Sequence, residues 1–242
     1  MTLNEALKES QEGNVFSKII FYDTLSSMVL ALNNGDIAMI EIDRNTADYI
    51  ASRNEEFVVR EPSVPAKSIV FSMLLREEDS ELCNQISAAV REMDADGTLE
   101  ILQRIYIEDV IAGMEPEAVE PQNIGGVKTL KVGVTGDRPP MDYISADNWP
   151  MGFNTALITG VASRMGMNVE FVNLNTASRG IALQTGRADV IFWVEEDYDN
   201  GEVTMGEDVP EGAIATDYYL ENPVAFVVLR SSPLAEVLAP AE

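Results

Sequence analysis

The chain has 242 residues and 46% of them are hydrophobic, which is enough to build one large domain or two small ones. A formal net charge of -25 excludes the basic face that nucleic acids require, so no nucleic-acid partner is expected. The chain has no histidine and a single cysteine, Cys83, which excludes Ser–His and Cys–His catalytic pairs and an intrachain disulfide.

The N-terminal part alternates short apolar runs with helical patterns. We predict a strand, a helix, a strand, a helix and a strand at residues 17–22, 24–35, 37–43, 45–54 and 57–61. The order is typical of a parallel sheet that is covered by helices.

The middle of the chain has a different pattern. A Pro-rich crossing at 61–67 precedes a predicted strand at 68–75 and two predicted helices at 78–95 and 97–111. The polar segment 114–128 is rich in Pro and Gly, so we predict a linker there.

The C-terminal part repeats the first alternation. Strand, helix, strand, helix and strand are predicted at residues 130–136, 153–166, 168–175, 176–186 and 188–194. The stretch ALNNGDIAMI (31–40) aligns without gaps on ALQTGRADVI (182–191), with Gly35 and Gly186 where a helix end needs left-handed backbone. We therefore predict two related α/β lobes, each a mostly parallel sheet flanked by helices.

The segment 130–172 resembles the opening of amino-acid-type extracellular solute-binding proteins, the two-lobed receptors of ABC importers. The resemblance rests on Gly136-Asp137-Arg138-Pro139-Pro140-Met141 and on Gly152-Phe153-Asn154. The segment 22–50 resembles the second lobe of the family, and 76–106 resembles its closing helices with their Ala-Asp-Gly-Thr-Leu ending at 95–99. The resemblance implies a type II periplasmic-binding-protein-like fold.

The order of these segments differs from the family. We divide the chain into a second-lobe-like segment whose first strand is missing, a returning strand with closing helices, a linker, a first-lobe-like segment and a tail, at residues 1–66, 67–112, 113–128, 129–230 and 231–242. The chain is either a circular permutant or a window from a tandem array. A missing strand leaves an open sheet edge, which favours a homodimer formed by strand or lobe exchange.

In the family, a second-lobe carboxylate binds the ammonium group of an amino acid and a first-lobe arginine binds its carboxylate. Asp43 ends a predicted strand and matches that carboxylate, although it is equally suited to cap the following helix. The family's arginine is missing, because the acidic stretch WVEEDYDNGEV (193–203) stands in its place. Arg138 and Arg179 are candidate replacements, or they are solvated surface charges.

A second interpretation is a pocket for a cationic solute. Carboxylates and aromatic faces would line it, namely Asp43, Asp137, Glu195, Glu196, Tyr143, Trp193 and Tyr218. Alternatively, residues 195–211 are an acidic solvated loop, or a broken calcium loop from Glu196 to Glu207.

The resemblance implies reversible binding of a small amino-acid-like or cationic solute between the lobes, without catalysis, cofactor or metal. The implied partners are the small-molecule solute and the membrane permease of an ABC importer, and the implied location is extracytoplasmic. The polar N-terminal stretch lacks a signal-peptide pattern, and no stretch is long and apolar enough to span a bilayer. The alternatives are a sensing domain from a tandem receptor and a degenerate interaction module that binds no solute.

Overall fold

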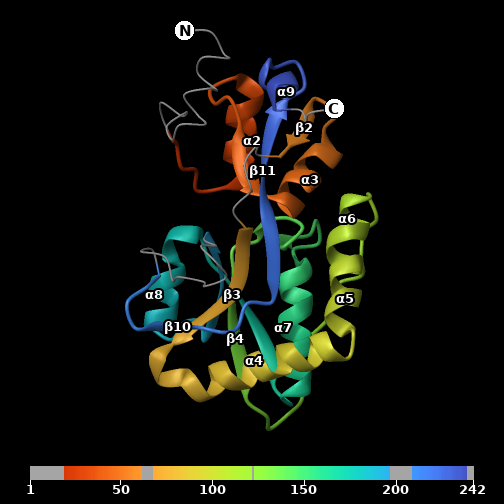
Figure 1. The fold of residues 1–242 in the computed structure, drawn as a ribbon. Coiled ribbons are helices and arrows are strands. Elements are labelled where there is room, and N and C mark those ends of the chain that lie inside the picture. The colour runs from red at the N-terminus through yellow and green to blue at the C-terminus, as the bar shows by residue number, and fades with distance from the viewer. Residues whose placement is uncertain (1–18, 62–67, 122, 197–208, 239–242) are drawn as a thin grey trace.

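The computed structural model describes residues 19–61, 68–121, 123–196 and 209–238, and for Glu195 and Glu196 it describes the backbone alone. Figure 1 shows two lobes, one above the other, with a single long strand running through both. We call them the upper lobe, which holds α2, β1, α3, β2 and α9, and the lower lobe, which holds the remaining elements apart from the shared strand β11.

The upper lobe is a three-stranded sheet with helices on both faces. Its elements are α2 (Leu25–Asn34), β1 (Ile40–Asp43), α3 (Arg44–Arg53), β2 (Phe57–Arg60), the upper half of β11 (Leu220–Leu229) and α9 (Leu234–Val237). Val227 of β11 is opposite Ile40 of β1 and Val59 of β2, so β11 is the central strand and both neighbours are antiparallel to it. The side chains of α2 and α3 bury one face, and Ala235 and Leu238 bury the other.

The lower lobe is a mixed sheet in the order β11-β3-β9-β4-β8, with β10 beside β3. Its strands are β3 (Ser68–Arg76), β4 (Thr129–Val134), β8 (Asn168–Asn173), β9 (Val190–Glu196) and β10 (Ala213–Ala215), and a separate small sheet contains β5 (Asp137–Arg138), β6 (Asp142–Ile144) and β7 (Pro150–Met151). Its helices are η1 (Glu77–Asp79), α4 (Ser80–Ala95), α5 (Thr98–Gln103), the π-helical turn η2 (Arg104–Glu108), α6 (Asp109–Ile111), α7 (Phe153–Arg164), η3 (Thr176–Ser178) and α8 (Arg179–Gln184).

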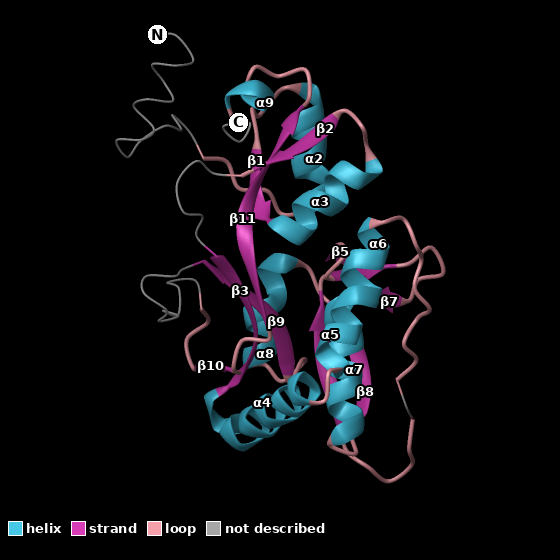
Figure 2. Cartoon of the chain, turned by 45° about the vertical axis from the view of Figure 1, so that its right-hand side comes forward, coloured by secondary structure: helices cyan, strands magenta, loops and turns pink. Residues whose placement is uncertain are grey.

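Strand direction differs from the prediction of mostly parallel sheets. Only the pairs of β4 with β8 and β9 are parallel, whereas β3 and β11 are antiparallel to every described strand beside them. The difference arises because β3 and β11 are not part of a strand–helix–strand repeat. Figure 2 shows β11 extending through both lobes, while β3 follows the last strand of the upper lobe in the sequence and pairs only with strands of the lower sheet. Neither direction is therefore set by a strand–helix–strand unit within one lobe.

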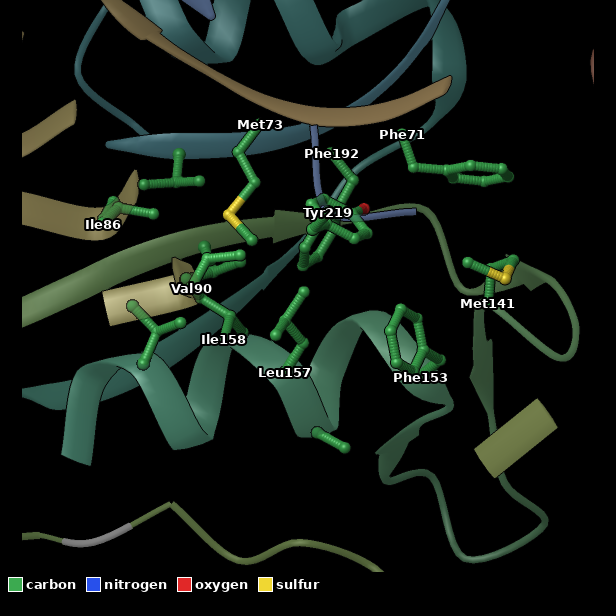
Figure 3. Close-up of a cluster of buried hydrophobic side chains, with 14 of the residues drawn as sticks. Phe71, Met73, Ile86, Val90, Met141, Phe153, Leu157, Ile158, Phe192 and Tyr219 are labelled. Atoms are coloured by element: carbon green, nitrogen blue, oxygen red, sulfur yellow. The ribbon is translucent and has the colours of Figure 1, made fainter. Parts of the chain in front are cut away.

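Alternating side chains of the lower sheet are buried on its two faces. Phe71, Met73 and Leu75 of β3 belong to the core under α4 and α7, whereas Leu74, between Met73 and Leu75, faces α8. Figure 3 shows Phe153, Leu157 and Ile158 of α7 pointing toward Phe192 and Tyr219 of the sheet layer. Burial on both faces explains why these strands read as continuous apolar runs in the sequence.

The strand predicted at 17–22 is wrong for its described part. Residues 19–22 are in no strand, and Ile19 and Phe21 are 71% and 91% exposed. A β-prone run needs a neighbouring strand to bond with its backbone, and none is paired with it among the described residues. The two glycines are as predicted, with φ of 77° at Gly35 and 69° at Gly186. Across the described ranges, every helix is too short or too polar to cross a membrane.

Candidate functional site

Asp43 links the two lobes directly. It ends β1 and caps α3, and its Oδ1 accepts a hydrogen bond from the Thr46 backbone N–H at 3.0 Å. Its Oδ2 accepts one from Nη2 of Arg138, in β5 of the lower lobe, at 2.8 Å. The Asp43 side chain is 0% exposed and that of Arg138 is 28% exposed. The predicted helix cap is therefore confirmed, and an arginine of the chain occupies the carboxylate expected to bind an ammonium group.

Two polar atoms near this ion pair are left without partners. Nε of Arg138 and Oγ1 of Thr46 are buried and make no hydrogen bond. The Arg138 guanidinium also lies 5.4 Å from the centroid of the Phe71 ring. Buried donors normally have a hydrogen-bond partner, so the Asp43–Arg138 ion pair leaves hydrogen-bonding groups beside it unused.

Asp142 is a buried carboxylate that the sequence analysis missed. It begins β6, and its Oδ1 accepts hydrogen bonds from the Gly136 backbone N–H at 2.9 Å and the Thr135 hydroxyl at 3.0 Å. Burial raises the pKa of Asp142, and these hydrogen bonds and the charge of Arg138 oppose that rise.

Tyr219 is a second buried group that the sequence analysis missed. Burial raises the pKa of its phenol well above the usual value, and its hydroxyl donates to Oδ1 of Asn154 at 2.8 Å. The negative charge of Asp142 raises this pKa further and the positive charge of Arg138 lowers it. Tyr218, which was predicted instead, is 51% exposed.

Arg179 begins α8 and covers the ring of Trp193. Its guanidinium carbon lies 4.7 Å from the ring centroid, and its Nη1 donates to the Phe192 carbonyl at 3.0 Å. Among the described side chains, no carboxylate forms an ion pair with it. Burial lowers the pKa of Arg179, and the positive charge of Arg138 lowers it further, whereas Asp142 and Asp137 raise it. The structure therefore brings the two candidate replacement arginines into one electrostatic environment.

A cavity of about 530 Å³ lies between α2 and α3 and reaches the turn at residues 137–139 of the lower lobe. Leu25, Val29 and Ile50 are among its apolar lining residues, and Asp137 and Arg53 supply charge. A volume of this size is within the range of small-molecule sites.

Tyr143 belongs to the boundary between the lobes. Burial raises the pKa of its phenol, and so does the proximity of Tyr49 in the upper lobe. The Arg53 side chain also joins the lobes, because its Nη2 donates to the Val110 carbonyl at 2.7 Å. Tyr143 and Asp137 are therefore near the lobe boundary, as predicted for site residues, although their contact with a solute stays a prediction.

Glu195 and Glu196 occupy the end of β9, and their side chains lie outside the described residues. The calcium-like spacing from Glu196 to Glu207 also lies mostly outside them. No group of Cys, Asp and Glu in the described part of the chain is placed to hold a metal ion.

The residues missed by sequence reasoning left a faint signal. The apolar Met141 before Asp142 is the only faint signal of its burial, and it is outweighed because a carboxylate close to a Pro-Pro turn is usually exposed. Tyr218 and Tyr219 are adjacent, and neighbouring side chains of an extended chain point to opposite faces. The sequence therefore does not tell which of the two rings is buried.

One segment of the lower lobe matches a known protein family. Residues 130–194 match the model of bacterial extracellular solute-binding proteins, family 3. The match includes Asp137, Arg138, Tyr143, Arg179 and Trp193, and it excludes Asp43 and the rest of the upper lobe. It covers well under half of the 242 residues and does not concern the order of the segments. No curated protein matches the chain.

Several solved structures share the general fold at low similarity. A phosphate-binding protein of a phosphate ABC transporter from Streptococcus pneumoniae TIGR4 is 12% identical, with a TM-score of 0.41 over 97% of this chain and 89% of that one. An ancestral arginine-binding protein bound to arginine is 13% identical, with a TM-score of 0.39 over 98% and 75%. The regulatory domain of OxyR in its reduced form, from Pseudomonas aeruginosa, is 9% identical, with a TM-score of 0.38 over 89% and 76%. At identities of 9–13% these likenesses concern the fold alone.

Proposed function

We propose that the protein reversibly binds a small solute between its two lobes and acts by binding rather than by catalysis. The family match over 130–194 supports this proposal, because that segment contains Arg138, Asp142 and Arg179. The observation that carries the proposal is the direct contact of Asp43 with Arg138, because it joins charged groups from both lobes at one place.

The mechanism follows from this arrangement. A solute that contacts both lobes binds the closed form more tightly than an open one, so it shifts the population toward closure. In this proposal the lobes change their angle about β11, the strand that joins them.

We further propose that the solute is delivered to the permease of an ABC importer from the extracytoplasmic side. In this proposal residues 129–230 form the first-lobe-like segment and residues 1–66 form part of the second. The description of the matched family as extracellular supports this role.

One observation favours a second candidate function. Asp43 and Arg138 satisfy each other's charge directly, so this contact between the lobes needs no solute. A degenerate module that binds a protein partner and no solute would have this property.

A thermal-shift screen separates the two candidates. The panel contains amino acids, small carboxylates, polyamines, sugars and inorganic phosphate, on protein whose folding is verified by circular dichroism. A solute that binds only the folded state raises the melting temperature in a dose-dependent way. A dose-dependent rise with at least one class supports solute binding, and the absence of any rise across the panel contradicts it and favours the module.

A further inference from the structure

The chain's own arginines occupy both places at which the sequence predicts recognition of a cation. Arg138 lies against the carboxylate of Asp43, at 2.8 Å. Arg179 lies over Trp193, at 4.7 Å from the ring centroid. A cationic solute would have to displace a guanidinium group from each of these partners.

The unpaired N–H donors of Arg138 and Arg179 also argue against a cationic solute. A guanidinium group has five N–H donors and no acceptor, and most of those on Arg138 and Arg179 have no partner among the described residues. Nε of Arg138 is buried and unpaired. An ammonium group would add donors to a site that already has them in excess, whereas a carboxylate or phosphate group would supply acceptors.

The charges nearest Arg179 leave it open to an anion. It has no ion-pair partner within the described part of the chain. The carboxyl group of Asp142 is buried, with its Oδ1 already accepting two hydrogen bonds from Thr135 and Gly136. The guanidinium plane of Arg179 matches the geometry of a carboxylate, which it can bind through two parallel hydrogen bonds.

We propose that the solute is a small carboxylate without a cationic group, that Arg179 binds its anionic end, and that Arg138 determines specificity by occupying Asp43. This inference rests on the proposed function and specifies the class of its solute. Arg138 acts against amines and amino acids, because they reach Asp43 only by leaving a guanidinium group without its buried partner.

Matched pairs of probes test the proposal, each pair differing by one α-ammonium group: propionate and alanine, succinate and L-aspartate, glutarate and L-glutamate. Putrescine serves as a purely cationic probe. Isothermal titration is expected to show that, in the pair that binds, the carboxylate binds at least about tenfold more tightly than the amino acid. Putrescine is expected to give no heat of binding.

Variants identify the residues responsible. Arg179→Gln is expected to weaken binding of the carboxylate by at least about tenfold, while Arg187→Gln, at an exposed arginine a short distance along the chain, leaves it unchanged. Arg138→Gln is expected to strengthen binding of the matched amino acid by exposing Asp43. If that variant is poorly folded, Arg138→Lys retains a cation opposite Asp43 and is expected to bind the amino acid as weakly as the unmodified protein.

Each contrary outcome has a separate meaning. Tighter binding of an amino acid or of putrescine by the unmodified protein overturns the inference and leaves solute binding intact. Binding of sugars but of no carboxylate does the same. The absence of binding by every class in the broader panel contradicts the proposed function itself.

Discussion

Replacing Arg138 with Met is expected to destabilise the protein through the carboxylate that it leaves behind. Asp43 is 0% exposed, so it cannot exchange its lost partner for water, while its remaining Oδ1 bond to Thr46 satisfies only part of the charge. Removing one member of a buried ion pair costs about 3–5 kcal/mol. Because Arg138 itself is 28% exposed, we expect a loss near the lower end, about 3 kcal/mol. For a chain of this size that corresponds to roughly 6–12 °C in melting temperature.

A double-mutant cycle measured by urea denaturation tests this reasoning. Asp43→Asn keeps a good helix cap and removes the charge, so Asp43→Asn combined with Arg138→Met should recover most of the stability lost in Arg138→Met alone. Two results would refute the account: a loss below about 1 kcal/mol in the single variant, or strictly additive effects in the double variant. Either would mean that the two charges do not depend on each other in the folded state.

Three other predictions concern the lower lobe. Burial raises the pKa of Asp142, so the folded protein holds this proton more tightly than the unfolded chain, and stability falls as pH rises through that pKa. Asp142→Asn should therefore remove a fall in unfolding free energy that begins as pH rises above the unfolded pKa of about 4, and an unchanged pH profile in urea denaturation would contradict this. The hydrogen bond from Thr98 is the main cause that lowers the pKa of Asp96 to about 2. The stability that the Asp96 carboxylate contributes is therefore present above its unfolded pKa and lost as pH falls through about 2. Asp96→Asn should accordingly destabilise the protein at neutral pH and have little effect near pH 2, and a titration of its carboxyl by NMR checks the pKa directly. Gly152→Ala should lower the free energy of unfolding by at least about 2 kcal/mol, because φ is 104° and the new Cβ would lie 2.5 Å from a backbone oxygen. Gly125→Ala, whose new Cβ meets no atom within 4 Å, is the control in thermal denaturation.

Local patterns predicted the longer described helices and the strands β1, β2, β3, β4, β8 and β9, but they gave no strand at β5, β6, β7, β10 or β11 and no helix at α9. The helix at 153–166 and the strand at 168–175 are found at 153–164 and 168–173, because their apolar spacing and flanking glycines are determined within a few residues. Strand direction could not be predicted in this way. The antiparallel entry of β3 and β11 depends on which lobe each strand joins, and that information is absent from a window of ten residues.

The candidate site was only partly predictable for a similar reason. A residue at a strand end, such as Asp43, can be recognised as a probable interface group from its position alone. Its partner comes from a turn 95 residues later in the chain, and no spacing rule connects Asp43 with Arg138. Trp193 was identified as an available aromatic face, yet Arg179 covers it, because the rotamer of a long side chain depends on the tertiary surroundings.

The position of β11 has a consequence for biosynthesis. It is the last of the described strands in sequence order, yet it is the central strand of the upper sheet and connects β3 to it. Until Leu220–Leu229 leave the ribosome, Ile40 and Phe57 have no sheet to pack on, and the apolar edge of β3 is unpaired. Such long-range pairing predicts slow folding, in which the upper sheet forms only after β11 has been synthesised and the apolar side chains of β1 and β2 stay exposed until then.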